Sequence, residues 1–142
     1  MHTVGQILTK ARGGLVTIEP EATVLDALRV MAERNIGAIL ITQGSNLLGI
    51  FTERHYARNV ILEGRQSVDT PVRDVMSTEM FPVEPNQSVD DCMSLMTEHR
   101  VRHLPVMGQG QLIGIVSIGD LVKATIAAQE QTIDELTRYI GS

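Results

Sequence analysis

Two side chains in the last third of the chain, Ser117 and Asp120, have types and spacing suited to binding a polar ligand. They follow a short apolar run within residues 114–120, which is expected to lead directly from a strand into a helix. A hydroxyl at that junction can cap the helix or meet a phosphate beside exposed helix N–H groups. A carboxylate three residues later lies on the same side and can accept hydrogen bonds from a ribose diol.

A similar stretch occurs earlier in the chain, at residues 49–55. Residues 18–56 align with residues 83–121 at a constant offset of 65, and 9 of the 39 aligned pairs are identical. Unrelated sequences would share about two or three. The chain therefore contains an internal repeat, in which Thr52 and His55 take the places of Ser117 and Asp120.

Each repeat predicts the same order of elements, strand–helix–strand–strand–helix. Thr23 and Ser88 stand at N-cap positions, and each precedes apolar residues at helical spacing. The expected strands are residues 15–18, 38–42, 47–52, 104–107 and 111–117, and the helices that follow the strand pairs are residues 53–62 and 119–128.

The repeats divide the chain into four parts. Residues 4–63 form the first repeat, 64–70 a polar connection, 71–128 the second repeat, and 129–142 a helical tail. The connection is too short for an independent linker domain, so the repeats should pack against each other. Apolar residues of the tail follow a helical spacing, so the tail either continues the last helix or folds back to contact a partner. A solvated, frayed terminus is the alternative.

Composition restricts the class of protein. A hydrophobic content of 43% with 20% charged residues is ordinary for a soluble globular protein. The net charge of −5 and the 3% aromatic content argue against nucleic-acid binding.

Cys92 is the only cysteine, which excludes an internal disulfide and a cysteine-based metal cluster and suits a reducing cytoplasm. The first residues lack the basic and then apolar pattern of a secretion signal, and no apolar run approaches the ~18 residues needed to span a bilayer. We expect a cytoplasmic protein without membrane contact.

The element order resembles the cystathionine-β-synthase (CBS) domain. So does the motif Gly-h-h-Thr/Ser-x-x-Asp at the entry to the last helix, where h is a hydrophobic residue and x any residue. Two copies in register are similar to the tandem pair called a Bateman module. Residues 74–77, which open the second repeat, and residues 101–106 in its middle support the resemblance. It implies a mixed α+β fold of two β-α-β-β-α repeats related by pseudo-twofold symmetry, with their sheets packed together and helices flanking them.

The resemblance also implies a function. CBS pairs commonly act as sensors, including energy sensors, and not as enzymes. They bind adenine nucleotides such as AMP, ADP, ATP, S-adenosylmethionine or NAD in clefts between the repeats. A metal cofactor is not expected. Stand-alone pairs usually form homodimers, and the signal would pass through a conformational or packing change to an effector protein that the sequence does not identify.

Carried onto this sequence, the resemblance favours the site of the second repeat. Asp120 would hold the ribose hydroxyls, Ser117 would lie near the phosphate or ribose, and Arg102 would reach the phosphate. Val83 and Ile115 would sandwich the adenine. The implied ligand-binding residues, with Arg54 reaching over from the first repeat, are Val83, Arg102, His103, Ile115, Ser117, Asp120 and Arg54.

The site of the first repeat departs from the family pattern. Its implied residues are Ile18, Gly37, Ala38, Ile50, Thr52 and His55. His55 replaces the ribose-binding carboxylate, and Gly37 removes the phosphate donor that Arg102 supplies in the other repeat. A neutral histidine can still hydrogen-bond a ribose, whereas a protonated one favours phosphate. We expect this site to be weaker, empty, or adapted to another part of a larger ligand.

Other interpretations remain open. Ser117 and Thr52 can be plain N-caps, Asp120 can complement the helix dipole, and capping can coexist with binding. The chain can be a structural or protein-interaction module that has lost ligand binding. A nucleotide hydrolase using His55 or His103 is a remote alternative, because a phosphate-binding loop and paired catalytic acids are missing.

Overall fold

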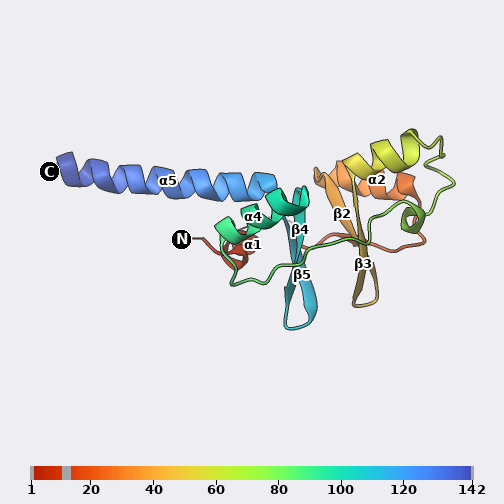
Figure 1. Ribbon diagram of the computed structural model, residues 1–142, viewed down its shortest axis with the longest axis horizontal. Helices are drawn as coiled ribbons and strands as arrows, with labels where there is room; N and C mark the ends of the chain where they lie inside the picture. The colour runs from red at the N-terminus through yellow and green to blue at the C-terminus, as the bar shows by residue number, and fades with distance from the viewer. Residues whose placement is uncertain (1, 11–13, 142) are drawn as a thin grey trace. The chain divides into compact units, whose positions relative to one another are not determined.

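The computed structural model describes residues 2–10 and 14–141, which fold into two compact units. One unit combines the N-terminal segment, through residue 10, with residues 81–141; the other comprises residues 14–80. Each unit has its own hydrophobic core. The predicted mixed α+β fold is confirmed by this combination of small sheets and flanking helices (Figure 1).

The unit of residues 14–80 holds a three-stranded sheet of order β1-β2-β3. The first pair of strands is parallel and the second antiparallel. Its elements are β1 (Thr17–Ile18), α2 (Val24–Arg34), β2 (Ala38–Gln43), β3 (Asn46–Thr52), α3 (Glu53–His55), the π-helix η1 (Tyr56–Ile61) and the 3₁₀-helix η2 (Val72–Asp74).

Residues at both ends of helix α2 explain where it begins and ends. Thr23 Oγ1 accepts from the Asp26 N–H at 3.1 Å, and Asp26 Oδ2 accepts from the Thr23 N–H at 3.3 Å, which forms a reciprocal capping box. The helix ends at Asn35, whose φ of 54° is left-handed and turns the chain toward β2. Val24 and Met31 lie on its buried face and pack with Phe51 of β3 in the core.

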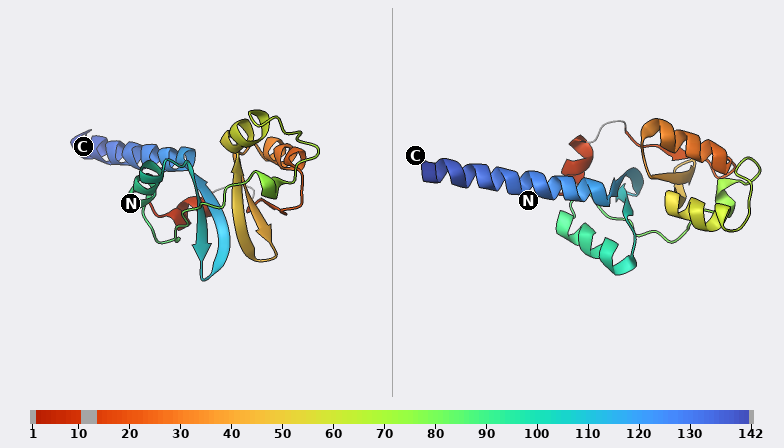
Figure 2. Two further views of the ribbon diagram at one scale, coloured as in Figure 1. Left: turned by 45° about the vertical axis from the view of Figure 1, so that its right-hand side comes forward. Right: turned by 90° about the horizontal axis from the view of Figure 1, so that it is seen from above.

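The other unit is built on an antiparallel pair of strands. Its elements are α1 (Val4–Lys10), α4 (Val89–His99), β4 (His103–Gly108), β5 (Gln111–Ser117) and α5 (Ile118–Gly141). A parallel bridge between Val83 and Val106 stands where the first repeat has β1. Figure 2 shows α4 and α5 close together in both views, and the two helices are in contact.

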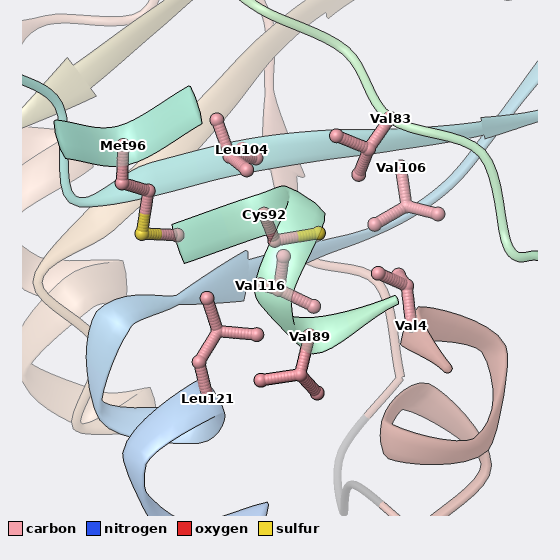
Figure 3. Packing of buried hydrophobic residues seen from close by; sticks show 9 residues of the cluster. All are labelled: Val4, Val83, Val89, Cys92, Met96, Leu104, Val106, Val116 and Leu121. Atoms are coloured by element: carbon pink, nitrogen blue, oxygen red, sulfur yellow. The ribbon is translucent and has the colours of Figure 1, made fainter. Parts of the chain in front are cut away.

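Nine buried side chains from α1, α4, α5, the two strands and Val83 form the core of this unit. They converge on one interior (Figure 3) and are Val4, Val83, Val89, Cys92, Met96, Leu104, Val106, Val116 and Leu121. Burial, and secondarily the neighbouring Asp91, raises the pKa of the Cys92 thiol. A protonated thiol among aliphatic side chains serves as a core residue.

Each unit contains a short helix from the beginning of the repeat that otherwise forms the other unit. In α1, the Val4 N–H donates to the Gln87 carbonyl at 2.9 Å, and the Gly5 N–H donates to the Pro85 carbonyl at 2.8 Å. Helix η2 lies in the other unit, where Val72 is fully buried and its N–H donates to the Ala22 carbonyl at 2.7 Å. The repeats of the sequence and the compact units of the fold are therefore not the same division of the chain.

Two predicted helices differ in detail. Only residues 53–55 of the expected helix 53–62 are α-helical, because the chain then widens into the π-helix η1. Its wider turn accompanies both the burial of Val60 and a 3.0 Å hydrogen bond from Asn59 Nδ2 to the Val75 carbonyl. The last helix does not stop near residue 128, since α5 continues to Gly141. The tail thus extends the helix, and from Gln129 to Gly141 it is exposed.

Candidate functional site

The strand–helix junction of the second repeat is a reciprocal capping box. The Asp120 N–H donates to Ser117 Oγ at 3.1 Å, and the Ser117 N–H donates to Asp120 Oδ2 at 2.9 Å. Both residues are half-buried. The interpretation of Ser117 and Asp120 as helix-capping residues is therefore confirmed.

Capping leaves Asp120 with a binding capacity. Its Oδ2 atom is used by the Ser117 N–H, and Oδ1 has no partner among residues 2–10 and 14–141. An ionised carboxylate accepts hydrogen bonds through both oxygens, so Oδ1 can receive a hydroxyl donor. The junction thus presents a free acceptor held in place by the helix cap.

Other predicted residues gather at the same end of the β4–β5 hairpin. His103 is the register partner of Ser117, and the Arg102 carbonyl accepts from the Ile118 N–H at 2.9 Å. The Arg102 side chain is exposed and forms no ion pair within the described chain. A guanidinium and a carboxylate therefore stand near one junction, a combination suited to the phosphate and the ribose of a nucleotide.

The two predicted adenine contacts, Ile115 and Val83, differ in how accessible their side chains are. Ile115 is half-buried on β5, so part of its side chain is accessible. Val83 is only 1% exposed, its N–H donates to the Pro105 carbonyl at 2.9 Å, and its carbonyl accepts from the Met107 N–H at 2.8 Å. Val83 serves the core in this conformation and offers a ligand neither an apolar surface nor a free main-chain group.

The junction of the first repeat has the same cap, with histidine as the reciprocal partner. The His55 N–H donates to Thr52 Oγ1 at 3.2 Å, and the Thr52 N–H donates to His55 Nδ1 at 3.1 Å. A backbone N–H can only donate, so Nδ1 must carry a lone pair and the proton of the neutral ring lies on Nε2. His55 reproduces the structural role of Asp120 with a different group facing outward.

The environment of His55 favours this neutral ring. Desolvation by burial, followed by the positive charges of Arg54 and Arg58, holds the pKa of His55 below its ordinary value of 6.5. The Phe51 ring lies 6.5 Å away, centroid to centroid. The imidazole is therefore a neutral hydrogen-bonding group near pH 7.

A pH prediction follows from the cap. The unfolded chain takes up a proton at His55 near pH 6.5 while the folded chain resists it, so we expect the unfolding free energy to fall as pH drops below that value. His55→Asn keeps a side-chain acceptor for the Thr52 N–H without titrating. Urea denaturation of both proteins between pH 8 and pH 5 checks this, and equal pH slopes would contradict it.

The remaining residues of the first-repeat site lie in more than one environment. Ala38 and Ile50 are buried, while Ile18 and Gly37 are half-buried. The Gly37 carbonyl accepts from the Glu53 N–H at 3.2 Å, and Glu53 Oε1 lies 3.1 Å from the point where a Cβ on Gly37 would stand. Glu53 therefore covers the side of the chain where Arg102 has its side chain in the other repeat.

A hollow of about 480 Å³ adjoins Gly37 and was not predicted from the sequence. Glu53, Tyr56 and the C-terminal end of α2 line it. The replacement of an arginine by Gly37 is the sequence signal that could have indicated open space here. Arg54 is exposed on α3 of this unit, and its contact with a ligand of the other repeat stays a prediction.

The described residues form no metal-binding group and no membrane-spanning helix. Among residues 2–10 and 14–141, no group of three or more His, Cys, Asp or Glu side chains could hold a metal ion. No helix in the described chain is long and apolar enough to cross a membrane.

Comparison with known proteins places these junctions in a family. The CBS domain matches twice, at residues 4–61 and 72–127. The chain belongs to the CBS-domain family. The two matches make it a tandem CBS pair, and together they include both capping junctions described above.

Similar proteins carry the same domains. The chain is 38% identical over 135 residues to the mitochondrial CBS domain-containing protein CBSX3 of Arabidopsis thaliana, covering 92% of this chain and 66% of that protein. It is 39% identical to the CBS domain-containing protein YhcV of Bacillus subtilis, covering 75% and 76% of the two chains.

Solved structures agree in fold. A CBS-domain protein of Burkholderia ambifaria, whose name assigns it to signal transduction, superposes with a TM-score of 0.84 at 50% identity, covering 89% of this chain and 96% of that one. The CBS-domain protein ATU1752 of Agrobacterium tumefaciens gives 0.80 at 36% identity, covering 87% and 98%. The tandem CBS fold is thereby established for this chain.

Proposed function

We propose that this CBS pair is a regulatory module that binds an adenine nucleotide at the strand–helix junction of its second repeat. The observation that carries the proposal is the capped Asp120, whose Oδ1 is a fixed and unpaired acceptor within the described chain. Vicinal ribose hydroxyls are the donors that such a carboxylate binds well. The exposed Arg102 supplies a cation for the phosphate.

Binding would act as a signal and not lead to a reaction. The junction couples β5 to α5, because Ser117 ends the strand and Asp120 lies in the first turn of the helix. A ligand that bridges these groups stabilises one conformation or packing of the module at the expense of others. An effector protein, or the other subunit of a homodimer, would respond to that change.

Asp120→Asn tests the proposal. The asparagine Oδ1 can still accept from the Ser117 N–H, but its amide nitrogen replaces the free acceptor with a donor. Calorimetric titration with AMP, ATP, NAD and S-adenosylmethionine should show saturable binding of at least one ligand, weakened about tenfold or more by Asp120→Asn.

Asp91→Asn is the matched control for this experiment. Asp91 occupies the third position of α4, and its N–H donates to the Oγ of the N-cap Ser88 at 3.1 Å. This variant changes the charge equally at a helix start of the same unit and should bind like the parent protein. No saturable binding of any adenine ligand, or equal weakening by both variants, would contradict the proposed function.

Exposed apolar residues of α5 favour a second candidate function, a protein-interaction module. Ile133 is 61% exposed and Leu136 56% exposed, and both lie on the part of the helix beyond Gln129. A partner protein that covers these residues would either respond to nucleotide binding or bind this chain without any nucleotide signal. Mass spectrometry of nucleotide released by heating the purified protein distinguishes a loaded sensor from an empty interaction module.

A further inference from the structure

The two capping junctions are alike in their inner hydrogen bonds. In each, the N-cap hydroxyl accepts from the N–H of the third helical residue, at 3.1 Å for Asp120 and 3.2 Å for His55. In each, the side chain of that third residue accepts from the N-cap N–H, at 2.9 Å and 3.1 Å. The side chains are therefore held in equivalent positions by equivalent contacts.

The outward atoms of the two side chains are opposite in kind. Asp120 Oδ1 is an acceptor, whereas the lone pair on His55 Nδ1 requires the neutral ring to carry its proton on Nε2. No residue of the described chain pairs with His55 Nε2. Every buried side-chain nitrogen or oxygen atom among the described residues has a hydrogen-bond partner, so the unpartnered Nε2 is not buried. The His55 Nε2–H is thus a donor open to solvent.

We propose that the first-repeat junction selects a phosphoryl oxygen through His55 Nε2–H, while the second-repeat junction selects ribose hydroxyls through Asp120. The proposal rests on the proposed function and assigns a different ligand group to the incomplete site. A ribose hydroxyl can also accept from an imidazole N–H, but a phosphoryl oxygen is the stronger, charged acceptor.

The charges around His55 agree with an anionic ligand group. Arg54 and Arg58 are both exposed, and their positive charges act on the ring. Neither forms an ion pair within the described part of the chain. The Glu53 carboxylate, the adjacent acid, has its Oε1 beside Gly37. Two unpaired guanidinium groups and an N–H donor favour phosphate over a neutral diol.

Two isosteric variants separate this role from the cap. His55→Asn and His55→Asp both provide an oxygen for the Thr52 N–H. The asparagine then presents an outward N–H donor and the aspartate an outward acceptor, as in the second repeat. If the donor is what matters, AMP binding at this junction stays within about threefold in His55→Asn and weakens about tenfold or more in His55→Asp.

The full-length protein is titrated with AMP, inorganic phosphate and adenosine while the imidazole ¹⁵N signals of His55 are followed by NMR. AMP should shift the Nε2 signal, and adenosine should leave it unchanged. A response to phosphate as strong as that to AMP would identify free phosphate as the source of the phosphoryl group. An equal response to adenosine, no response to either phosphate compound, or equal AMP affinity of the two variants would overturn the proposal.

Asp120→Asn keeps the two hypotheses distinguishable. AMP binding that requires Asp120 and leaves His55 silent would refute the phosphoryl site alone. A His55 response to phosphate in a protein that binds no adenine nucleotide would refute the proposed function and leave the phosphoryl site standing.

Discussion

Gly49→Ala is expected to destabilise the unit of residues 14–80 by about 3 kcal/mol, a large effect for one added methyl group. Gly49 lies in β3, two residues before the buried Phe51. A Cβ at this position would stand 2.6 Å from Met76 Sδ and 2.8 Å from the Ser77 carbonyl oxygen. The thioether can move aside, but the carbonyl belongs to the main chain.

The Ser77 main chain has little freedom to yield. Its carbonyl accepts from the Ile50 N–H at 2.9 Å, and its N–H donates to the Ile50 carbonyl at 2.9 Å. Relief of the clash would therefore stretch two hydrogen bonds of the residue that follows the substituted glycine. Denaturation by urea, followed by circular dichroism, measures the loss of stability.

Gly114→Ala is the matched control, because Gly114 is the equivalent glycine of the second repeat. A Cβ there would lie 2.9 Å from Leu8 Cδ2 and 3.0 Å from Leu8 Cδ1, the flexible end of a half-buried side chain. We expect a loss of about 1 kcal/mol. A Gly49 variant as stable as the Gly114 variant would contradict the backbone explanation.

Local signals in the sequence predicted much of the fold. The N-caps at Thr23 and Ser88 are confirmed, because a hydroxyl before an apolar helical stripe meets an unpaired helix N–H. The two hairpins are confirmed within one or two residues, since alternating apolar runs and turn residues are local properties. The Ser117–Asp120 pair could be placed together because its members are only three positions apart in the sequence.

Features that depend on long-range packing were not predicted. The π-helix after His55 accompanies the pairing of Asn59 with the Val75 carbonyl, a partner 16 residues away. The burial of Val83 depends on Pro105 and Met107, whose main-chain groups pair with it from β4. The sequence showed that His55 replaces a carboxylate, but not that its Nδ1 takes over the capping role, because only the fold gives the hydrogen-bond geometry.

The exchange of short helices between the units is the fold's clearest departure from a repeat-by-repeat division, and it carries the second large prediction. Val4 begins the first repeat in sequence but is fully buried in the core with Val106 and Val116 of the second. Val4→Asp places a charge in that core and should destabilise its unit by on the order of 4 kcal/mol. Val4→Ala should cost about 2 kcal/mol.

Hydrogen exchange identifies the unit that loosens. Amides of β4 and β5 should lose more protection than those of β2 and β3 when Val4 is replaced by alanine. Val72→Ala is the matched control, because Val72 is equally buried but belongs to the other core. It should reverse the pattern, loosening β2 and β3 first. If Val4→Ala loosened β2 and β3 instead, α1 would be a stabilising part of its own repeat, and the crossed assembly of the units would be wrong.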